Sequence, residues 1–216
     1  MVPRLALHPD RLLPADPATR TIARDLYRSV ASLPIISPHG HTDPAWFATN
    51  AAFGNATELL LVPDHYLLRM LYSQGIALED LGVAPRAEGS SADPRAAWRL
   101  FAAHYHLFRG TPSRIWLDWV FAECFGIAVR LSAETSDHYY DTITAALATP
   151  AFRPRALFER FGIEVIATTE SPLDPLDHHR AIRASGWAGR VITAYRPDPV
   201  VDPEFAGFAA NLAHLS

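Results

Sequence analysis

The segment from residue 33 to residue 44 reads LPIISPHGHTDP. Its apolar first half follows a predicted helix and indicates a short β-strand at 33–37. His39 and His41 come next, and residues two apart in an extended segment point the same way. Both imidazoles can then reach one ion, with Gly40 leaving space between them. Histidine nitrogens at a strand end suit zinc or a similar divalent cation. The pair therefore predicts a metal site, with surface-loop histidines as the alternative.

Two further segments have the β-branched composition of strands. They are 163–167, directly after Gly162, and 190–195, after a turn that contains glycine. Helical patterns separate the three segments, and this order predicts parallel strands joined by right-handed crossovers and adjacent in chain order. The sequence thus favours an α/β fold in which most of residues 42–160 form helices inserted after the first strand.

Capping residues followed by proline mark several helix starts. Asp16-Pro17 predicts a helix over 17–32, Asp93-Pro94 predicts another, and Asp202-Pro203 repeats the signal near the C-terminus. Ser113 is the expected cap of a very apolar helix that runs through Phe125. Other helices are expected at 137–148, 153–161 and 178–185, and a loop is expected at 85–92.

Polar residues follow the ends of the other two strands as well. Thr168, Thr169 and Glu170 follow the second strand, and Arg196 and Asp198 follow the third. In parallel α/β sheets and barrels, functional sites assemble at the carboxyl ends of the strands. We therefore expect one site at this edge of the sheet.

Composition excludes several classes of protein. The 216 residues are 49% hydrophobic and 19% charged, which suits one packed domain or part of a larger one. The net charge of −4 and the lack of a basic cluster argue against binding to nucleic acid. No apolar run approaches the roughly 20 residues that a membrane helix needs. The N-terminus lacks the apolar core of a secretory signal, so a cytoplasmic location is expected. All 19 basic residues are arginine, which excludes Schiff-base and phosphate-loop lysines within this chain, and Cys124 alone cannot form an internal disulfide.

Two other motifs carry groups that can transfer protons or bind anions. Adjacent His65 and Tyr66 are residue types that transfer protons, and Arg69 lies one helical turn away. A capped helix with a solvent-facing histidine explains this motif equally well. Arg196 could clamp an anionic substrate, or form a structural ion pair with Asp198 in a turn. The remaining histidines of note, His104, His106, His178 and His179, are expected to be surface or partly packed helix residues.

Together these motifs resemble the uronate isomerase (glucuronate isomerase) family of the amidohydrolase superfamily. The resemblance runs from about the first helix almost to the C-terminus, in family order. It rests on Leu33-Pro34-Ile35-Ile36 with His39-Gly40-His41 and Asp43-Pro44, Asn55-Ala56-Thr57-Glu58-Leu59, Asp64-His65-Tyr66 with Arg69, Trp116, Glu123 with Phe125-Gly126-Ile127, Thr168-Thr169 with Pro172, Asp174, Leu176 and His178, and Arg196-Pro197-Asp198.

The resemblance implies a partial (β/α)8 barrel with a large helical insertion after the first strand. Its segments would be 1–41, the first helix and strand; 42–160, the insertion; and 161–216, the second and third strands with their helices. It also implies the interconversion of D-glucuronate with D-fructuronate and of D-galacturonate with D-tagaturonate. His39 and His41 match the family's metal pair, expected to hold Zn²⁺ or Mn²⁺. His65 and Tyr66 are expected to be catalytic, and Arg69 and Arg196 to bind the hexuronate.

The chain departs from the family in three ways. Ser37 and Glu170 stand where the family often has aspartate. Family members are roughly twice as long as this chain. A complete eight-fold barrel alone needs about 250 residues, and the long insertion takes up much of the length available here. The chain therefore reads as an N-terminal portion that lacks the strand with the family's aspartate metal ligand. A metal-dependent hydrolase of the same superfamily and a non-catalytic fragment remain the alternatives, and open sheet edges favour self-association into a homo-oligomer.

Overall fold

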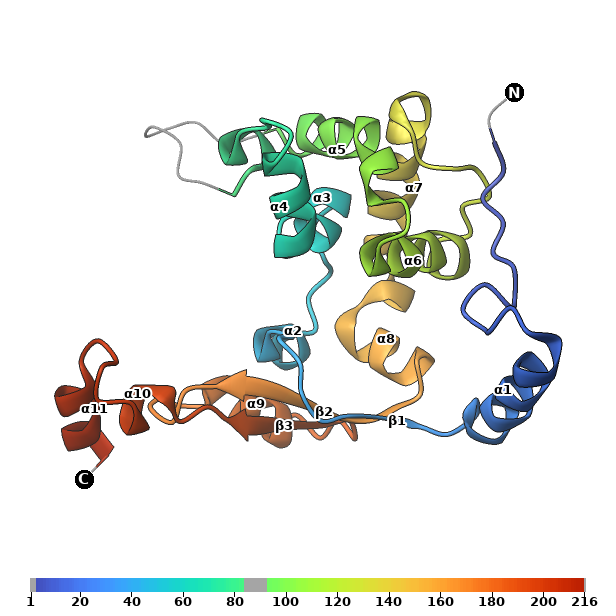
Figure 1. Ribbon diagram of the computed structural model, residues 1–216. Helices are drawn as coiled ribbons and strands as arrows, with labels where there is room; N and C mark the ends of the chain where they lie inside the picture. Colours follow the sequence, from blue (N-terminus) through green and yellow to red (C-terminus); the bar gives the residue numbers. More distant parts are fainter. Residues whose placement is uncertain (1–2, 84–92, 216) are drawn as a thin grey trace. The chain divides into compact units, whose positions relative to one another are not determined.

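The computed structural model describes residues 3–83 and 93–215, so the predicted loop at 85–92 lies outside the described residues. Helices dominate the described chain, and a few short turns of 3-10 helix and one π-helical segment join them (Figure 1). The α-helices and strands, in chain order, are α1 (Pro17–Val30), β1 (Ile35–Ser37), α2 (Pro44–Thr49), α3 (Ala56–Leu60), α4 (His65–Tyr72), α5 (Pro94–Ala103), α6 (Pro112–Trp119), α7 (Ser136–Leu147), α8 (Pro154–Arg160), β2 (Ile163–Glu170), α9 (Asp177–Ala184), β3 (Arg190–Tyr195), α10 (Asp198–Val201) and α11 (Phe208–Leu215).

The chain forms two compact units. The helical unit comprises Met1–Arg24 and Ala52–Phe152, and the sheet unit comprises Asp25–Ala51 and Arg153–Ser216. Helices α2 and α8, which flank the long insertion in sequence, belong to the unit that contains the strands. The division of the chain into barrel segments at residues 41 and 160 stays a prediction.

The sheet unit contains a three-stranded parallel sheet in the order β1-β2-β3, as the sequence predicts. Ser37 at the end of β1 pairs with Ile166 of β2, whereas Glu170 at the end of β2 pairs with Tyr195 of β3. Strands β2 and β3 therefore extend beyond β1 at their carboxyl ends. Because β1 ends earlier than β2, the segment that contains the two histidines can lie beside the last residues of β2.

One face of this sheet is covered by helices that contact each other and the strands. Helix α2 contacts α8 and α9, while α8 packs on β2 and α9 on β3. The apolar core between them consists of Phe47, Phe158, Ile166, Ile182 and Val191. Side chains at alternate positions of β2 share a face. Thr168, two residues beyond Ile166, therefore also points toward the helices.

The helical unit is built around buried aromatic side chains from α5, α7 and the short helical turns beside them. Trp98, Phe101, Tyr105 and Phe121 are fully buried there. The indole nitrogen of Trp98 donates to the Ser136 carbonyl at 3.1 Å, which satisfies the one polar atom of that buried ring. Between α2 and α8, the described residues contain no strand beyond an isolated bridge of Val129 with Arg4. The prediction that helices fill most of residues 42–160 is confirmed for the described part of that range.

Two helix starts differ from the prediction. Thr111, not Ser113, caps α6, because its hydroxyl accepts from the Arg114 amide and Pro112 occupies the first helical position. The helix then widens into a π-helical segment at Val120–Cys124. Asp202-Pro203 begins a turn and not a helix, although the Asp202 carboxylate accepts from the Glu204 amide at 2.9 Å. Gly207, with a φ of 83°, interrupts the chain before α11 begins.

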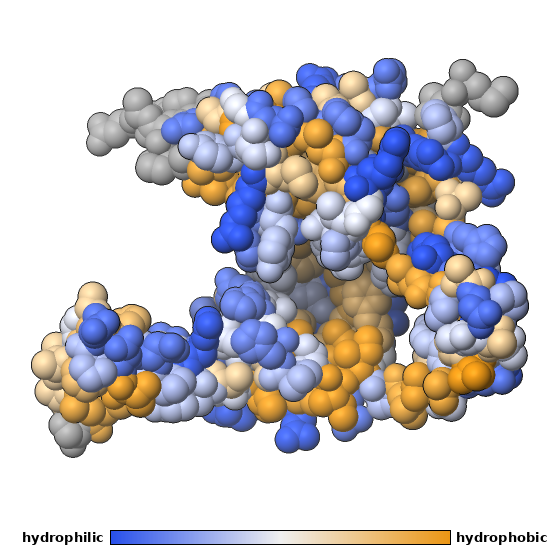
Figure 2. All heavy atoms as spheres, viewed as in Figure 1, coloured by the Kyte–Doolittle hydropathy of each residue, from blue (hydrophilic) through white to orange (hydrophobic). Residues whose placement is uncertain are grey.

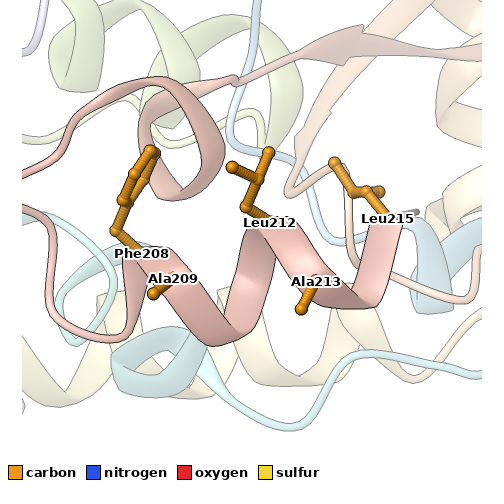
Figure 3. Close-up of a pocket in the computed structure, with 5 residues that line it drawn as sticks. All are labelled: Phe208, Ala209, Leu212, Ala213 and Leu215. Atoms are coloured by element: carbon orange, nitrogen blue, oxygen red, sulfur yellow. The ribbon is translucent and has the colours of Figure 1, made fainter.

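Several apolar faces of the sheet unit are open to solvent. Phe208, Leu212 and Leu215 project from one side of α11 and line a shallow cavity of about 620 Å³ (Figure 3). Apolar atoms are visible on the surface of this helix in the space-filling view (Figure 2). Ile35 and Ile36 of β1 are also exposed, at 48% and 61%. These surfaces are consistent with the expected self-association, which stays a prediction.

None of the helices among the described residues is both long enough and apolar enough to cross a membrane.

Candidate active site

The two histidines after β1 approach each other closely. The Nε2 atoms of His39 and His41 are 3.2 Å apart, and both side chains are exposed. Two nitrogens that each bind a metal at about 2.05 Å would, at this separation, subtend an angle of about 103°, close to the tetrahedral value. The donor set of this pair therefore fits two of the ligand positions of a zinc-like ion. The predicted approach of the imidazoles is confirmed, and their metal role stays a prediction.

The segment between the histidines rests on the central strand. The Thr169 hydroxyl of β2 donates to the Gly40 carbonyl at 3.2 Å. A methyl group added at Gly40 would meet the Ala167 carbonyl oxygen at 3.6 Å and the Thr42 hydroxyl at 3.9 Å, which is ordinary contact. Alanine would therefore fit at position 40.

The two histidines have no third close ligand among the described residues. Among the described residues, no group of three or more histidine, cysteine, aspartate or glutamate side chains is placed to hold a metal ion. A catalytic zinc site usually has three protein ligands. The described part of the chain thus supplies two positions of such a site.

A buried polar cluster at the end of β2 was missed by the sequence reasoning. His179 of α9 is only 2% exposed, so its assignment as a surface or partly packed histidine is wrong. Its Nε2 atom lies 2.9 Å from the Thr168 hydroxyl, which in turn lies 2.8 Å from the Glu170 carboxylate. If Thr168 donates to the carboxylate, it accepts from His179, which fixes the proton on Nε2 of that ring. Glu170 and His179 also line a cavity of about 320 Å³ beside α2.

Arg196 directly follows β3. Its guanidinium is exposed, and within the described residues it makes no ion pair or hydrogen bond. The alternative of an Arg196–Asp198 ion pair is therefore not realised; Asp198 is instead the first residue of α10. Because parallel strands end at one edge of the sheet, Arg196 follows the same edge as His39 and His41. The arginine is available there for an anion.

The other predicted residues lie on α4 of the helical unit. Asp64 caps this helix by accepting from the Tyr66 amide at 2.9 Å, so the capped-helix reading of the motif is correct as local structure. The rings of His65 and Tyr66 are 4.2 Å apart between centroids, and both side chains are exposed. Arg69 is also exposed, on the next turn. Tyr66 lines a cavity of about 530 Å³ with Met70, Phe108, Thr111, Pro112 and Ser113.

The structure therefore brings the predicted residues together in two groups. His39, His41 and Arg196 lie at the carboxyl edge of the sheet, and His65, Tyr66 and Arg69 lie on one helix of the other unit. Each group combines at least one imidazole with an exposed arginine that has no ion pair among the described residues. Such sets are typical of enzymes that act on small anionic substrates.

Comparison with known proteins identifies the family. A profile of the glucuronate isomerase family matches residues 17–216. The chain is 74% identical over 210 residues to a uronate isomerase of Xanthomonas euvesicatoria, covering 96% of this chain and 44% of that protein. It is 71% identical over 216 residues to a uronate isomerase of Sphingopyxis alaskensis, covering 98% of this chain and 45% of that protein. The chain belongs to the glucuronate isomerase family and spans less than half the length of these relatives.

Solved structures agree with this assignment. A crystal structure of glucuronate isomerase from Caulobacter crescentus superposes with a TM-score of 0.91 at 60% identity, covering 98% of this chain and 44% of that one. A uronate isomerase from Thermotoga maritima superposes with a TM-score of 0.84 at 23% identity, covering 97% and 44%, and this second match bears on the fold alone.

Proposed function

We propose that this chain provides the N-terminal part of a uronate isomerase active site. The reaction is an aldose–ketose isomerisation: D-glucuronate to D-fructuronate, and D-galacturonate to D-tagaturonate. The observation that carries the proposal is the family match over residues 17–216 combined with a histidine pair at the carboxyl edge of a parallel sheet. The reaction moves one proton from C2 to C1 and leaves the carboxylate at C6 unchanged.

The proposed architecture is a partial (β/α)8 barrel of the amidohydrolase type. Strands β1 to β3 would be its first three strands, because they are parallel, adjacent in chain order and joined through helices. Both outer strands, β1 and β3, would then pair with further barrel strands. Residues Ala52–Phe152 of the helical unit would belong to the insertion between the first and second strands.

His39 and His41 would hold a divalent cation, with Zn²⁺ and Mn²⁺ as the candidates. A bound divalent cation supplies Lewis-acid polarisation of the oxygens on the reacting carbons. Support comes from the 3.2 Å separation of the two Nε2 atoms and from the exposure of both rings. With two ligands from the described residues, the ion would need at least one more donor from outside them.

The remaining residues would bind the substrate and move its proton. Arg196 can form a bidentate pair with the uronate carboxylate, because its guanidinium has no partner among the described residues. Tyr66 and His65 present exposed groups that can donate or accept a proton, and Arg69 adds a second positive charge on α4. Which of these groups takes the C2 proton is left open by the residue types.

A chimera tests the proposal directly. Residues 1–216 replace the corresponding segment of the Xanthomonas relative, and the product is assayed for ketose formation from D-glucuronate with added Zn²⁺ or Mn²⁺. We expect turnover that is lost in His39→Ala and His41→Ala but kept in His106→Ala, a matched exposed histidine in the helical unit. An inactive chimera that folds, or equal activity in all four proteins, would overturn the proposal. The 216 residues alone should not turn over uronates, because they supply too few ligands.

A further inference from the structure

We propose that Thr169 is the positioning residue for the histidine pair. Its hydroxyl would hold the Gly40 carbonyl, and with it the peptide that leads into His41, at the end of the central strand. The inference rests on the metal role proposed above for His39 and His41. It extends that role to a residue that binds neither metal nor substrate.

The contact lies at the centre of the pair. The Thr169 hydroxyl donates at 3.2 Å to the carbonyl of the one residue between the two histidines. Gly40 also lies next to the Ala167 carbonyl, since a methyl group built on Gly40 would sit 3.6 Å from that oxygen. Residues 167 and 169 share a face of β2. The histidine segment therefore lies against β2 at two points, the main-chain carbonyl of Ala167 and the side chain of Thr169.

Little else holds this segment. Strand β1 ends at Ser37, which pairs with Ile166, so both histidines lie beyond the ladder between β1 and β2. Their side chains are exposed, so packing does not fix them either. The Thr169 hydroxyl continues the link between the two chain segments where the main-chain ladder stops. Helix α2 secures the far side, where Asp43 caps it by accepting from the Ala45 amide at 2.8 Å.

Neighbouring threonines do not share this role. Thr168 faces the opposite side of β2, where its hydroxyl is engaged by His179 and Glu170. Thr193 pairs with Thr168 across the sheet. Among the described residues, its hydroxyl makes one hydrogen bond, which it donates to the Ala194 carbonyl of its own strand at 3.4 Å. Thr193 is therefore a matched control: a strand threonine of the same sheet without a link to the histidine segment.

The effect should appear in metal affinity. Partners that orient metal ligands usually contribute ten- to a hundredfold to affinity, and a neutral hydrogen bond to a backbone carbonyl belongs at or below the lower end of that range. We expect Thr169→Val to weaken binding about five- to tenfold. Valine keeps the β-branched shape and removes only the hydroxyl, so the strand should form as before. Thr169→Ser keeps the hydroxyl and should bind within about twofold of the unaltered chain.

The experiment is a calorimetric titration of the metal-free chimera described above, in which residues 1–216 are joined to the remainder of the Xanthomonas relative, with Zn²⁺ and, separately, Co²⁺. The chains compared are unaltered, Thr169→Val, Thr169→Ser, Thr193→Val and His39→Ala. The Co²⁺ absorption spectrum reports the ligand geometry, and the thermal midpoint shows whether each variant folds. The inference is supported if, among the three threonine variants, Thr169→Val alone binds the metal more weakly and shows an altered Co²⁺ spectrum. Its thermal midpoint should stay unchanged.

Three results would overturn it. If Thr169→Val binds as tightly as Thr193→Val while His39→Ala loses binding, the metal site stands and Thr169 has no positioning role. If the unaltered chimera binds no metal, or His39→Ala binds as well as it does, the metal part of the proposed function fails and the inference fails with it. A midpoint that falls in Thr169→Val but not in Thr169→Ser, with equal affinities, would assign the hydroxyl to stability alone and also overturn the inference.

Discussion

Removing the Arg155 side chain should destabilise the sheet unit more than any other single arginine substitution in α8. This guanidinium joins the end of α2 to α8: Nε donates to the Phe47 carbonyl at 2.9 Å and an Nη atom donates to the Ala48 carbonyl at 3.3 Å. These carbonyls lie in the last turn of α2, where a positive charge also complements the helix dipole. The guanidinium further lies 5.1 Å from the centre of the Trp187 ring.

The size of the effect follows from these contacts. A hydrogen bond from a charged donor contributes about 1.5–3 kcal/mol, the 3.3 Å bond belongs at the weak end, and a cation–π contact at this distance adds about 0.5 kcal/mol. Partial solvent access of Arg155 reduces the sum, so we expect Arg155→Met to cost about 2–4 kcal/mol. For a unit of this size, each kcal/mol lowers the melting temperature by about 4–8 °C, which gives a fall of roughly 8–32 °C.

The matched control is Arg153→Met, two residues earlier. Arg153 is exposed and has no ion pair or side-chain hydrogen bond in the part of the chain that the structure describes. Urea and thermal unfolding, followed by Trp187 fluorescence in a background without the other tryptophans, report the sheet unit. The reasoning is refuted if both variants shift the transition equally, or if Arg155→Met costs less than about 0.5 kcal/mol, the usual range for surface substitutions.

Three further substitutions test other parts of the structure. Gly40→Ala should leave metal affinity unchanged and raise the free energy of unfolding by up to about 1 kcal/mol, because a methyl group fits and the unfolded chain loses entropy; a large loss of affinity in titration would contradict this. Asp118→Ala should lower the free energy of unfolding in urea by about 2–4 kcal/mol, because it leaves the Tyr105 hydroxyl and the Arg114 guanidinium without their carboxylate partner. Its control is Asp141→Ala, an exposed aspartate paired with Arg95, which should cost under about 1 kcal/mol. Hydrogen bonds from Arg99 and then Arg95 hold the pKa of Asp137 below its ordinary value, so its stabilising contribution is complete above that ordinary value and is lost as the pH falls through the lowered one. Asp137→Asn should therefore flatten the acid limb of a pH–stability curve, and an unchanged limb would count against the link between α5 and α7.

Local patterns predict the sheet because each strand forms for a local reason. The apolar runs after a helix or a glycine give β1, β2 and β3, and their separation by helices requires parallel pairing. The His39–Gly40–His41 spacing likewise predicts the approach of the two rings, because alternation along an extended chain does not depend on the rest of the fold. Both predictions use information within a few residues.

The missed features depend on which residues meet across the sheet unit. The sequence alone places His179 among surface or partly packed helix residues, because it cannot share a helical face with the adjacent His178. A signal was present, since His179 and Ile182 are three residues apart and therefore share the face of α9 that packs on the sheet. The cap of α6 was also readable, because Thr111-Pro112 is the same signal that Asp93-Pro94 gives for α5.

Asp202-Pro203 shows the limit of that signal. The carboxylate makes the capping contact with the Glu204 amide, yet no helix follows directly. A cap lowers the free energy of a helix start but cannot extend it through Gly207, whose positive φ is incompatible with a continuing helix. The start of a helix is thus a local property, and its length is decided by the residues that follow.

The same distinction explains why the central strand is the structural base of the candidate site. The two histidines directly follow β1, which is only three residues long and largely exposed. This strand by itself cannot hold the two imidazoles at a fixed separation. Strand β2 is eight residues long, is buried from Val165 to Thr168 and is paired on both sides. Its two faces serve different partners, with Thr168 directed to the His179 cluster and Thr169 to Gly40. The separation of the two imidazoles that follow β1 is therefore held by β2, the longer and better buried strand. Substitutions on β2 should disturb the histidine pair more than substitutions of the apolar residues of β1.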